Sequence, residues 1–185
     1  MLKRILLILL AVVAAFSGYV ALQPSDFRIE RSAIVVAPQA NTFAEVNDFH
    51  NWQEWSPWAK LDPNAKGTFE GPVSGEGAVF RWAGNDEVGE GSMTLTESKP
   101  DERVRIRVDF VKPWTGTNNS EFTFKPDGPR TLVTWAIYGE QGFLGKAICL
   151  FMNPQKMIGE PMEKGLANLK TRVEGKSAPA TADPT

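Results

Sequence analysis

The side chains best suited to chemistry are few in this sequence. The 185 residues include one histidine, His50, and one cysteine, Cys149. A Ser-His-Asp relay would have to use His50, and no nucleophile-elbow pattern accompanies it. One cysteine cannot form an intramolecular disulfide or a Cys-rich zinc site, and one histidine excludes a His-cluster metal site. We therefore expect neither a bound metal nor a cofactor.

The charged side chains closest to the apolar segments form no evident acid–base couple. These residues are Glu54, Glu76, Arg81, Asp109 and Glu140. Arg81 lies between Phe80 and Trp82, and strand residues alternate between the two faces of a sheet, so Arg81 is expected to face solvent. The same reasoning places Asp109 opposite to Phe110. General acid–base catalysis needs an acid and a base whose pKa values suit the proton transfers of the reaction. We therefore assign no catalytic residue and expect a binding protein in preference to an enzyme.

Other binding motifs are incomplete. The glycines in "GPVSGEG" (71–77) fit neither the dinucleotide nor the P-loop spacing, and turns and bulges of a bent sheet explain them better. The segment "DPNAKG" (62–67) begins like a calcium loop but places Lys66 at the fifth ligand position. The net charge of −2 offers no basic face for nucleic acid.

The clearest binding signal is aromatic. In "FHNWQEWSPWAKLDP" (49–63), Trp52, Trp55 and Trp58 are three residues apart and make up half of the six tryptophans. Aromatic residues at this spacing either fill a core or line a cavity, and the sequence leaves both open. Methionine adapts to varied shapes, so the same two interpretations hold for a second group. That group is Met152, Met157 and Met162.

The N-terminal segment predicts a membrane helix. Lys3 and Arg4 precede a charge-free run over residues 5–22, and 18 helical residues span about 27 Å, close to the thickness of the hydrocarbon layer. The two basic residues favour a cytoplasmic N-terminus, so the rest of the chain would face outward, into the periplasm or the extracellular space. A cleaved signal peptide is the alternative, with Ala15 and Ser17 near a possible cleavage site.

Residues 27–174 read as one α+β domain. The segment 27–37 is rich in β-branched residues, and two short helices should follow, separated at Asn47 and Asp48 and ended by Pro57. About six strands are expected between residues 66 and 140. The clearest is "RVRIRVDF" (103–110), whose alternation predicts one buried and one wet face, as in an antiparallel sheet.

A long helix should close the domain. Ile158, Met162, Leu166, Leu169 and Val173 form an apolar stripe at helical spacing. The prolines at positions 154 and 161 are expected to interrupt or kink this segment. Residues 175–185 are small and polar, which predicts a disordered tail. Domain boundaries are thus expected at 1–26 for the anchor, 27–174 for the folded domain and 175–185 for the tail.

The order and content of these segments resemble the START-like, or helix-grip, superfamily. The nearest type is the bacterial polyketide cyclase/dehydrase and lipid-transport group of SRPBCC proteins. Four segments carry the resemblance over residues 30–174: "NWQEWSPWAKLDP", "FEGPVSGEGAVFRWAGNDEVGEGSMTLTES", "TLVTWAIYG" and "MIGEPMEKGLANLK". The resemblance implies a bent antiparallel sheet of about seven strands around a long C-terminal helix. It also implies a cavity between them that takes hydrophobic ligands in many members.

Three functions follow as hypotheses. The first is a membrane-anchored domain that binds a hydrophobic small molecule or lipid, with no nucleic-acid partner. The second is a cyclase or dehydratase, and the third is an interaction or stress-response module without a ligand. For the first, we predict a cavity lined by Trp52, Trp55, Trp58, Phe80, Trp82, Ile106, Val108, Phe110, Phe122, Trp135, Met157 and Met162. The sequence does not identify the ligand or the oligomeric state.

Overall fold

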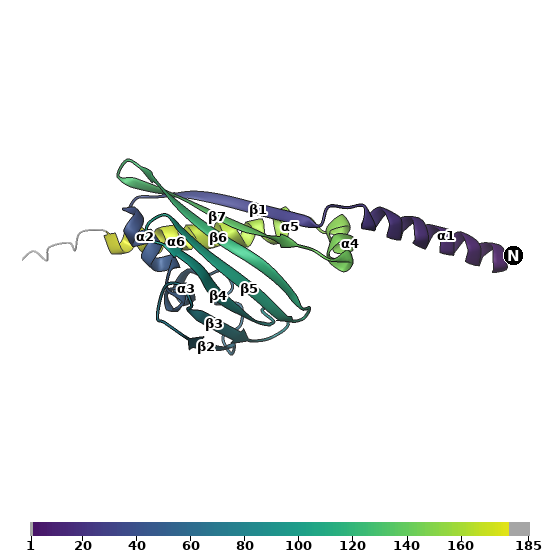
Figure 1. Cartoon of the computed structure of the whole chain (residues 1–185), viewed down its shortest axis with the longest axis horizontal. Coiled ribbons are helices and arrows are strands. Elements are labelled where there is room, and N and C mark those ends of the chain that lie inside the picture. Colours follow the sequence, from purple (N-terminus) through teal and green to yellow (C-terminus); the bar gives the residue numbers. More distant parts are fainter. Residues whose placement is uncertain (1, 178–185) are drawn as a thin grey trace, which may run out of the picture.

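The N-terminal helix stands apart from the rest of the chain. In a computed structural model, which describes residues 2–177, α1 (Leu2–Ala21) projects from one end of the domain (Figure 1). Of its residues only Val20 is buried. The helix is long and apolar enough to cross a membrane, as the charge-free run predicts.

Seven antiparallel strands form one sheet in the order β1-β7-β6-β5-β4-β3-β2. They are β1 (Asp26–Val35), β2 (Lys66–Glu70), β3 (Val79–Ala83), β4 (Glu90–Lys99), β5 (Arg103–Lys112), β6 (Gly116–Asp127) and β7 (Arg130–Glu140). From β2 to β7 each strand pairs with the next along the chain, and β1 completes the sheet beside β7. The number of strands and their antiparallel order confirm the prediction.

Alternation along β5 sets the two faces of the sheet. Val104 and Ile106 are buried, whereas Arg105 and Arg107 lie on the opposite face and pair with carboxylates. We call the first the inner face and the second the outer face. One face buried and one wet is the arrangement that an antiparallel sheet permits.

Two short helices lie at one end of the inner face. They are α2 (Gln39–Val46) and α3 (Phe49–Trp55). Asp48 separates them as predicted, because its side chain accepts a hydrogen bond from the backbone N–H of His50 and so caps α3. The helix ends before Pro57, since proline disfavours helical geometry at the preceding residue.

Three helices complete the fold: α4 (Phe143–Phe151), α5 (Pro154–Met157) and α6 (Gly159–Ser177). The long α6 runs along the inner face (Figure 1) and buries the predicted stripe from Met162 to Val173. Pro154 begins α5 after the cap residue Asn153. Pro161, by contrast, does not break α6, because a proline in the first helical turn removes no intrahelical hydrogen bond. The helix extends to Ser177, and residues 178–185 of the predicted tail lie outside the described residues.

Candidate functional site

The twelve residues predicted to line a cavity fall into three groups by exposure. Six are buried: Trp52, Trp55, Ile106, Phe122, Trp135 and Met162. Five are half-buried: Trp58, Phe80, Trp82, Val108 and Phe110. Met157, on α5, is half exposed at 50%. The strand residues among the twelve all lie on the inner face of the sheet.

The buried group is a packed aromatic cluster. Trp55 is fully buried and Trp52 is 3% exposed. The Trp55 ring centroid lies 4.6 Å from that of Trp52 and 6.0 Å from that of Trp135. Phe122 stacks on Trp135 at 4.8 Å. These rings therefore fill the space between α3 and the sheet, and they contact one another.

Every indole N–H in this cluster has an acceptor. Trp52 donates to the carbonyl of Val46 at 2.8 Å, and Trp135 donates to the Ser120 hydroxyl at 2.8 Å. Trp55 donates to the carbonyl of Glu45 at 3.3 Å. Because buried polar groups are costly when unpaired, these bonds fix the orientation of the rings. The arrangement is that of a structural core.

Burial on the inner face decreases from one end of the sheet to the other. The strand pairings align Phe122 with Trp135 and Val104, and the next level aligns Ile106 with Leu95. These two levels are buried. Two further levels are half-buried except at Gly91, which is buried: Val108 with Met93 and Phe80, then Phe110 with Gly91 and Trp82. The inner face is thus only partly covered beyond Ile106.

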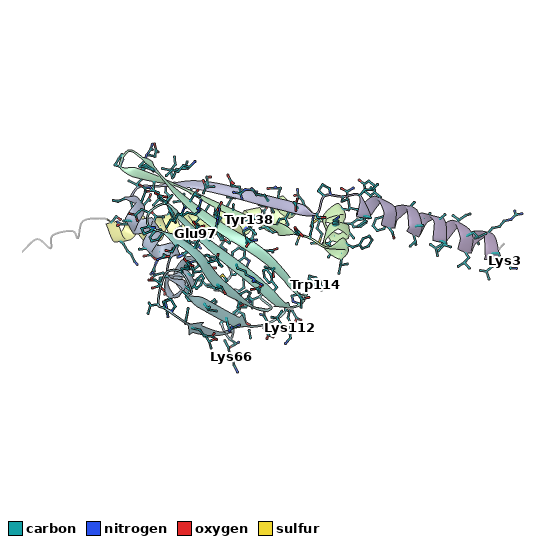
Figure 2. The ribbon with its side chains drawn as sticks, viewed as in Figure 1. Lys3, Lys66, Glu97, Lys112, Trp114 and Tyr138 are labelled. Carbon is teal, nitrogen blue, oxygen red and sulfur yellow. The ribbon has the colours of Figure 1, made fainter. Side chains whose placement is uncertain are left out.

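The partly covered end of the inner face carries a continuous row of aromatic rings. Phe69 lies 4.9 Å from Phe80, Phe80 lies 6.4 Å from Trp82, and Trp82 lies 5.9 Å from Phe110, between ring centroids. We call these four residues the aromatic row. Its far end, by Phe110, leads into the loop that carries Trp114. Figure 2 shows Lys112 and Trp114 at the end of the sheet nearer to α1.

A glycine in β4 lets the row lie flat on the sheet. A Cβ atom at Gly91 would lie 2.6 Å from the Trp82 ring and 2.5 Å from the carbonyl oxygen of Asp109. The pairing register shifts at this point, which marks a bulge. The Trp82 indole then donates to the carbonyl of Val88 at 2.9 Å. Bulge, glycine and hydrogen bond together hold the Trp82 ring over the strand.

Several residues of this site escaped the sequence prediction. Met93 and Phe69 border the half-buried region. Met93 alternates in phase with Leu95, so the period-two pattern was available as a signal. Glu45 is buried and binds Arg172 at 2.6 Å, which joins α2 to α6. Nothing in the local pattern around Glu45 distinguishes it from a surface glutamate.

The outer face is polar. Arg105 bridges Glu121 at 2.7 Å and Glu97 at 2.9 Å across three strands. Hydrogen bonding from Arg103 lowers the pKa of Glu97 below its ordinary value. Two depressions open on this face, of about 720 Å³ and 250 Å³. The larger is lined in part by Arg28 and Tyr138, and its mixed polar lining does not suit an apolar ligand. Figure 2 labels Tyr138 on the sheet.

Of the residues considered for catalysis, Arg81 and Asp109 lie on the outer face, and His50 is exposed beside Phe69 at one end of the aromatic row. Arg81 pairs with Glu70 on the outer face at 2.8 Å. Asp109 accepts hydrogen bonds from Thr117 and Arg107 there; burial alone would raise its pKa, and these bonds outweigh it and lower the pKa. The Nδ1 atom of His50 lies 2.8 Å from a carboxylate oxygen of Asp48, the cap residue of α3. The His50 ring stacks on Phe69. Among residues 2–177, no cluster of three His, Cys, Asp or Glu side chains is placed to hold a metal.

The match to a family model agrees with this architecture. The model for "Polyketide cyclase / dehydrase and lipid transport" matches residues 26–174. The chain belongs to this family. Membership confirms the resemblance seen in the four segments, over almost the same part of the chain. No curated protein matches the sequence.

Solved structures share the fold at low sequence identity. CV1439 from Chromobacterium violaceum is 15% identical with a TM-score of 0.57, over 82% of this chain and 99% of that one. TTHA0849 from Thermus thermophilus is 15% identical with a TM-score of 0.56, over 82% and 100%. Ara h 8.0201 is 10% identical with a TM-score of 0.53, over 82% and 97%. These similarities confirm the helix-grip fold and, at such identities, the fold alone.

Proposed function

We propose that this family member is a membrane-anchored domain that binds an apolar small molecule or lipid on the uncovered part of the inner face. The observation that carries the proposal is the aromatic row, in which Phe80, Trp82 and Phe110 are half-buried and Phe69 is exposed, next to a buried core. Soluble domains cover most of their large apolar side chains, so an aromatic surface left open inside a fold favours a ligand. The family's description, which includes lipid transport, agrees with an apolar ligand.

The row offers contact area and few polar groups. Phe80, Trp82 and Phe110 present ring faces or edges, and Met93 and Val108 present aliphatic surface. Apolar burial stabilises a complex by about 25 cal/mol per Å². We infer that this contact supplies the affinity. Phe80, Met93 and Val108 pack against the buried core that includes Trp55 and Trp135.

Anchoring rests on α1. Its 20 residues extend about 30 Å, the thickness of the hydrocarbon layer, and almost all of its side chains are exposed. Lys3 and Arg4 at its start favour a cytoplasmic N-terminus, which would place the domain outside the cytoplasm.

Native mass spectrometry of the protein purified from its own membrane tests the ligand. We expect a co-purifying apolar species that is lost, or much reduced, in Phe110→Ala. Val111→Ala is the matched control, because Val111 is the next residue and is exposed. Unfolding of both variants is measured alongside, so that a loss of ligand is separated from a loss of fold. Equal ligand content in the two variants would overturn the proposed site.

The packed core favours one other candidate, an interaction module that holds no small molecule. The rings of the aromatic cluster contact one another, and a module without a ligand would have such a filled core. An unliganded protein in the same experiment, stable and monodisperse, would support this second candidate.

A further inference from the structure

We propose that α4 lies in the outer interface of the bilayer that α1 crosses, so that the domain meets the membrane at two places. This inference rests on the proposed anchoring by α1 and adds a second membrane element to it. In this arrangement, phospholipid contacts the exposed side chains of α4.

The composition of α4 is unusual for a helix on the surface of a soluble domain. Its sequence "FLGKAICLF" contains one charge, Lys146, and none of its residues is buried. Phe143 and Leu144 are more than half exposed, and Phe151 is 79% exposed. A surface helix normally turns a polar face to water. This helix instead presents apolar side chains, which calls for an apolar environment.

Contacts with α1 identify that environment. The Phe151 ring lies 6.1 Å from the ring of Phe16, and the Lys146 ammonium reaches the carbonyl of Ala21 at 3.5 Å. Phe16 precedes Ala21 by five residues, so it lies about 7.5 Å deeper along the helix axis. Interfacial helices bury their apolar face by about 5–10 Å. The two contacts therefore place α4 at the depth of an interfacial helix.

Polar and aromatic groups at the same level agree with this depth. Tyr19 is exposed near the outer end of α1, and tyrosine is enriched where hydrocarbon meets headgroups. Lys146 can extend its ammonium towards the headgroups while its methylenes stay in the apolar layer. With nine residues, α4 is about 14 Å long and cannot cross the bilayer. It can only lie along the surface.

The placement of α4 would also orient the aromatic row. The loop after Phe110 lies at the end of the sheet nearer to α1 (Figure 2), so two contact points on the membrane turn this end towards the lipid. A domain tethered by α1 alone could rotate freely. With α4 embedded, the open end of the inner face stays close to the bilayer, the source of an apolar ligand.

Depth-dependent quenching tests the inference in the full chain. In a Cys149→Ser background, Leu144→Cys is labelled with an NBD fluorophore and the protein is reconstituted into vesicles of phosphatidylcholine and phosphatidylglycerol. Val73→Cys is the control, because Val73 is 68% exposed in a loop whose Gly75 bonds to Asn47, near α2 and far from α1 (Figure 1). We expect doxyl-labelled lipid to quench the label at 144 by about two-fold or more, as for a group within the acyl boundary. The label at 73 should respond only to aqueous iodide.

Each other result overturns the inference in a distinct way. Vesicle flotation measures membrane binding of the whole chain and so tests the anchoring by α1 independently of the label on α4. A chain that floats but whose label at 144 is quenched by iodide would leave α1 as the anchor and remove α4 from the bilayer. A label protected from both quenchers would assign the surface to a protein partner or a second copy. A chain that does not float would refute the anchoring itself, and with it the position of α4.

Discussion

At the scale of residues, two neighbours in β5 separate the two faces of the sheet. Ile106 is 1% exposed, so Ile106→Asp would bury a charge and should cost several kcal/mol of the roughly 5–15 kcal/mol that stabilise a domain. Arg105→Gln loses two cross-strand ion pairs on the wet face, each worth about 0.2–1 kcal/mol. Urea unfolding measures both. Equal losses would contradict the inner and outer assignment.

Substitutions of two tryptophans should separate an effect on stability from an effect on ligand binding. Trp55 is fully buried among other rings, so Trp55→Ala should lower the free energy of unfolding by about 3–5 kcal/mol. Trp82 is half-buried in the aromatic row, so Trp82→Ala should lower affinity for an apolar fluorescent probe more than it lowers stability. Arg81→Ala, on the opposite face of β3, is the control for Trp82. Probe binding that depends on Trp55 at unchanged stability would show that the cluster lines a pocket and is not a packed core.

At the scale of elements, charge on the outer face should make stability depend on pH. The hydrogen bond from Arg103 at 2.6 Å lowers the pKa of Glu97 from 4.5. A lowered pKa in the folded state stabilises the fold above the unfolded value and loses this effect as the pH falls below it. Arg103→Gln should therefore be less stable than the wild type at neutral pH, and the difference should shrink below pH 4.5. A difference that stays constant with pH would assign the loss to packing.

The sheet was predictable because its signals are local. Alternation in "RVRIRVDF" depends on one strand and its two environments, so β5 and its faces could be read from the sequence. The cap at Asp48 is also local. The interruption at Pro154 was predicted, since α4 ends at Phe151 and α5 begins at Pro154. The break at Ile158 and the tolerated Pro161 were not predicted, because both depend on position within the first turn of a helix.

The site was only partly predictable because its openness depends on long-range coverage. Trp55 and Trp82 are both tryptophans on apolar faces, yet one is buried and the other is half-buried. The difference arises from where α3 and α6 lie over the sheet, far away in sequence. The same holds for α4, because its exposure and its contact with α1 depend on residues far away in the sequence.

At the scale of the whole molecule, α1 should fix the protein to the membrane. The full chain is expected in the membrane pellet after a high-salt wash, because apolar insertion is insensitive to ionic strength. Protease added outside the cytoplasm should digest the domain, given the basic residues at the start of α1. A soluble product with a new N-terminus near residue 18 would instead indicate a cleaved signal peptide.

Photo-crosslinking can show whether an apolar ligand occupies the aromatic row. The full chain is reconstituted in vesicles that contain a diazirine-labelled fatty acid, irradiated and digested, and the modified residues are mapped by mass spectrometry. We expect modification on the inner face of β3 to β5, at Phe80, Trp82, Val108 and Phe110, and less modification when excess unlabelled fatty acid is present. Modification confined to α1 and α4, with none on β3 to β5, would contradict this expectation.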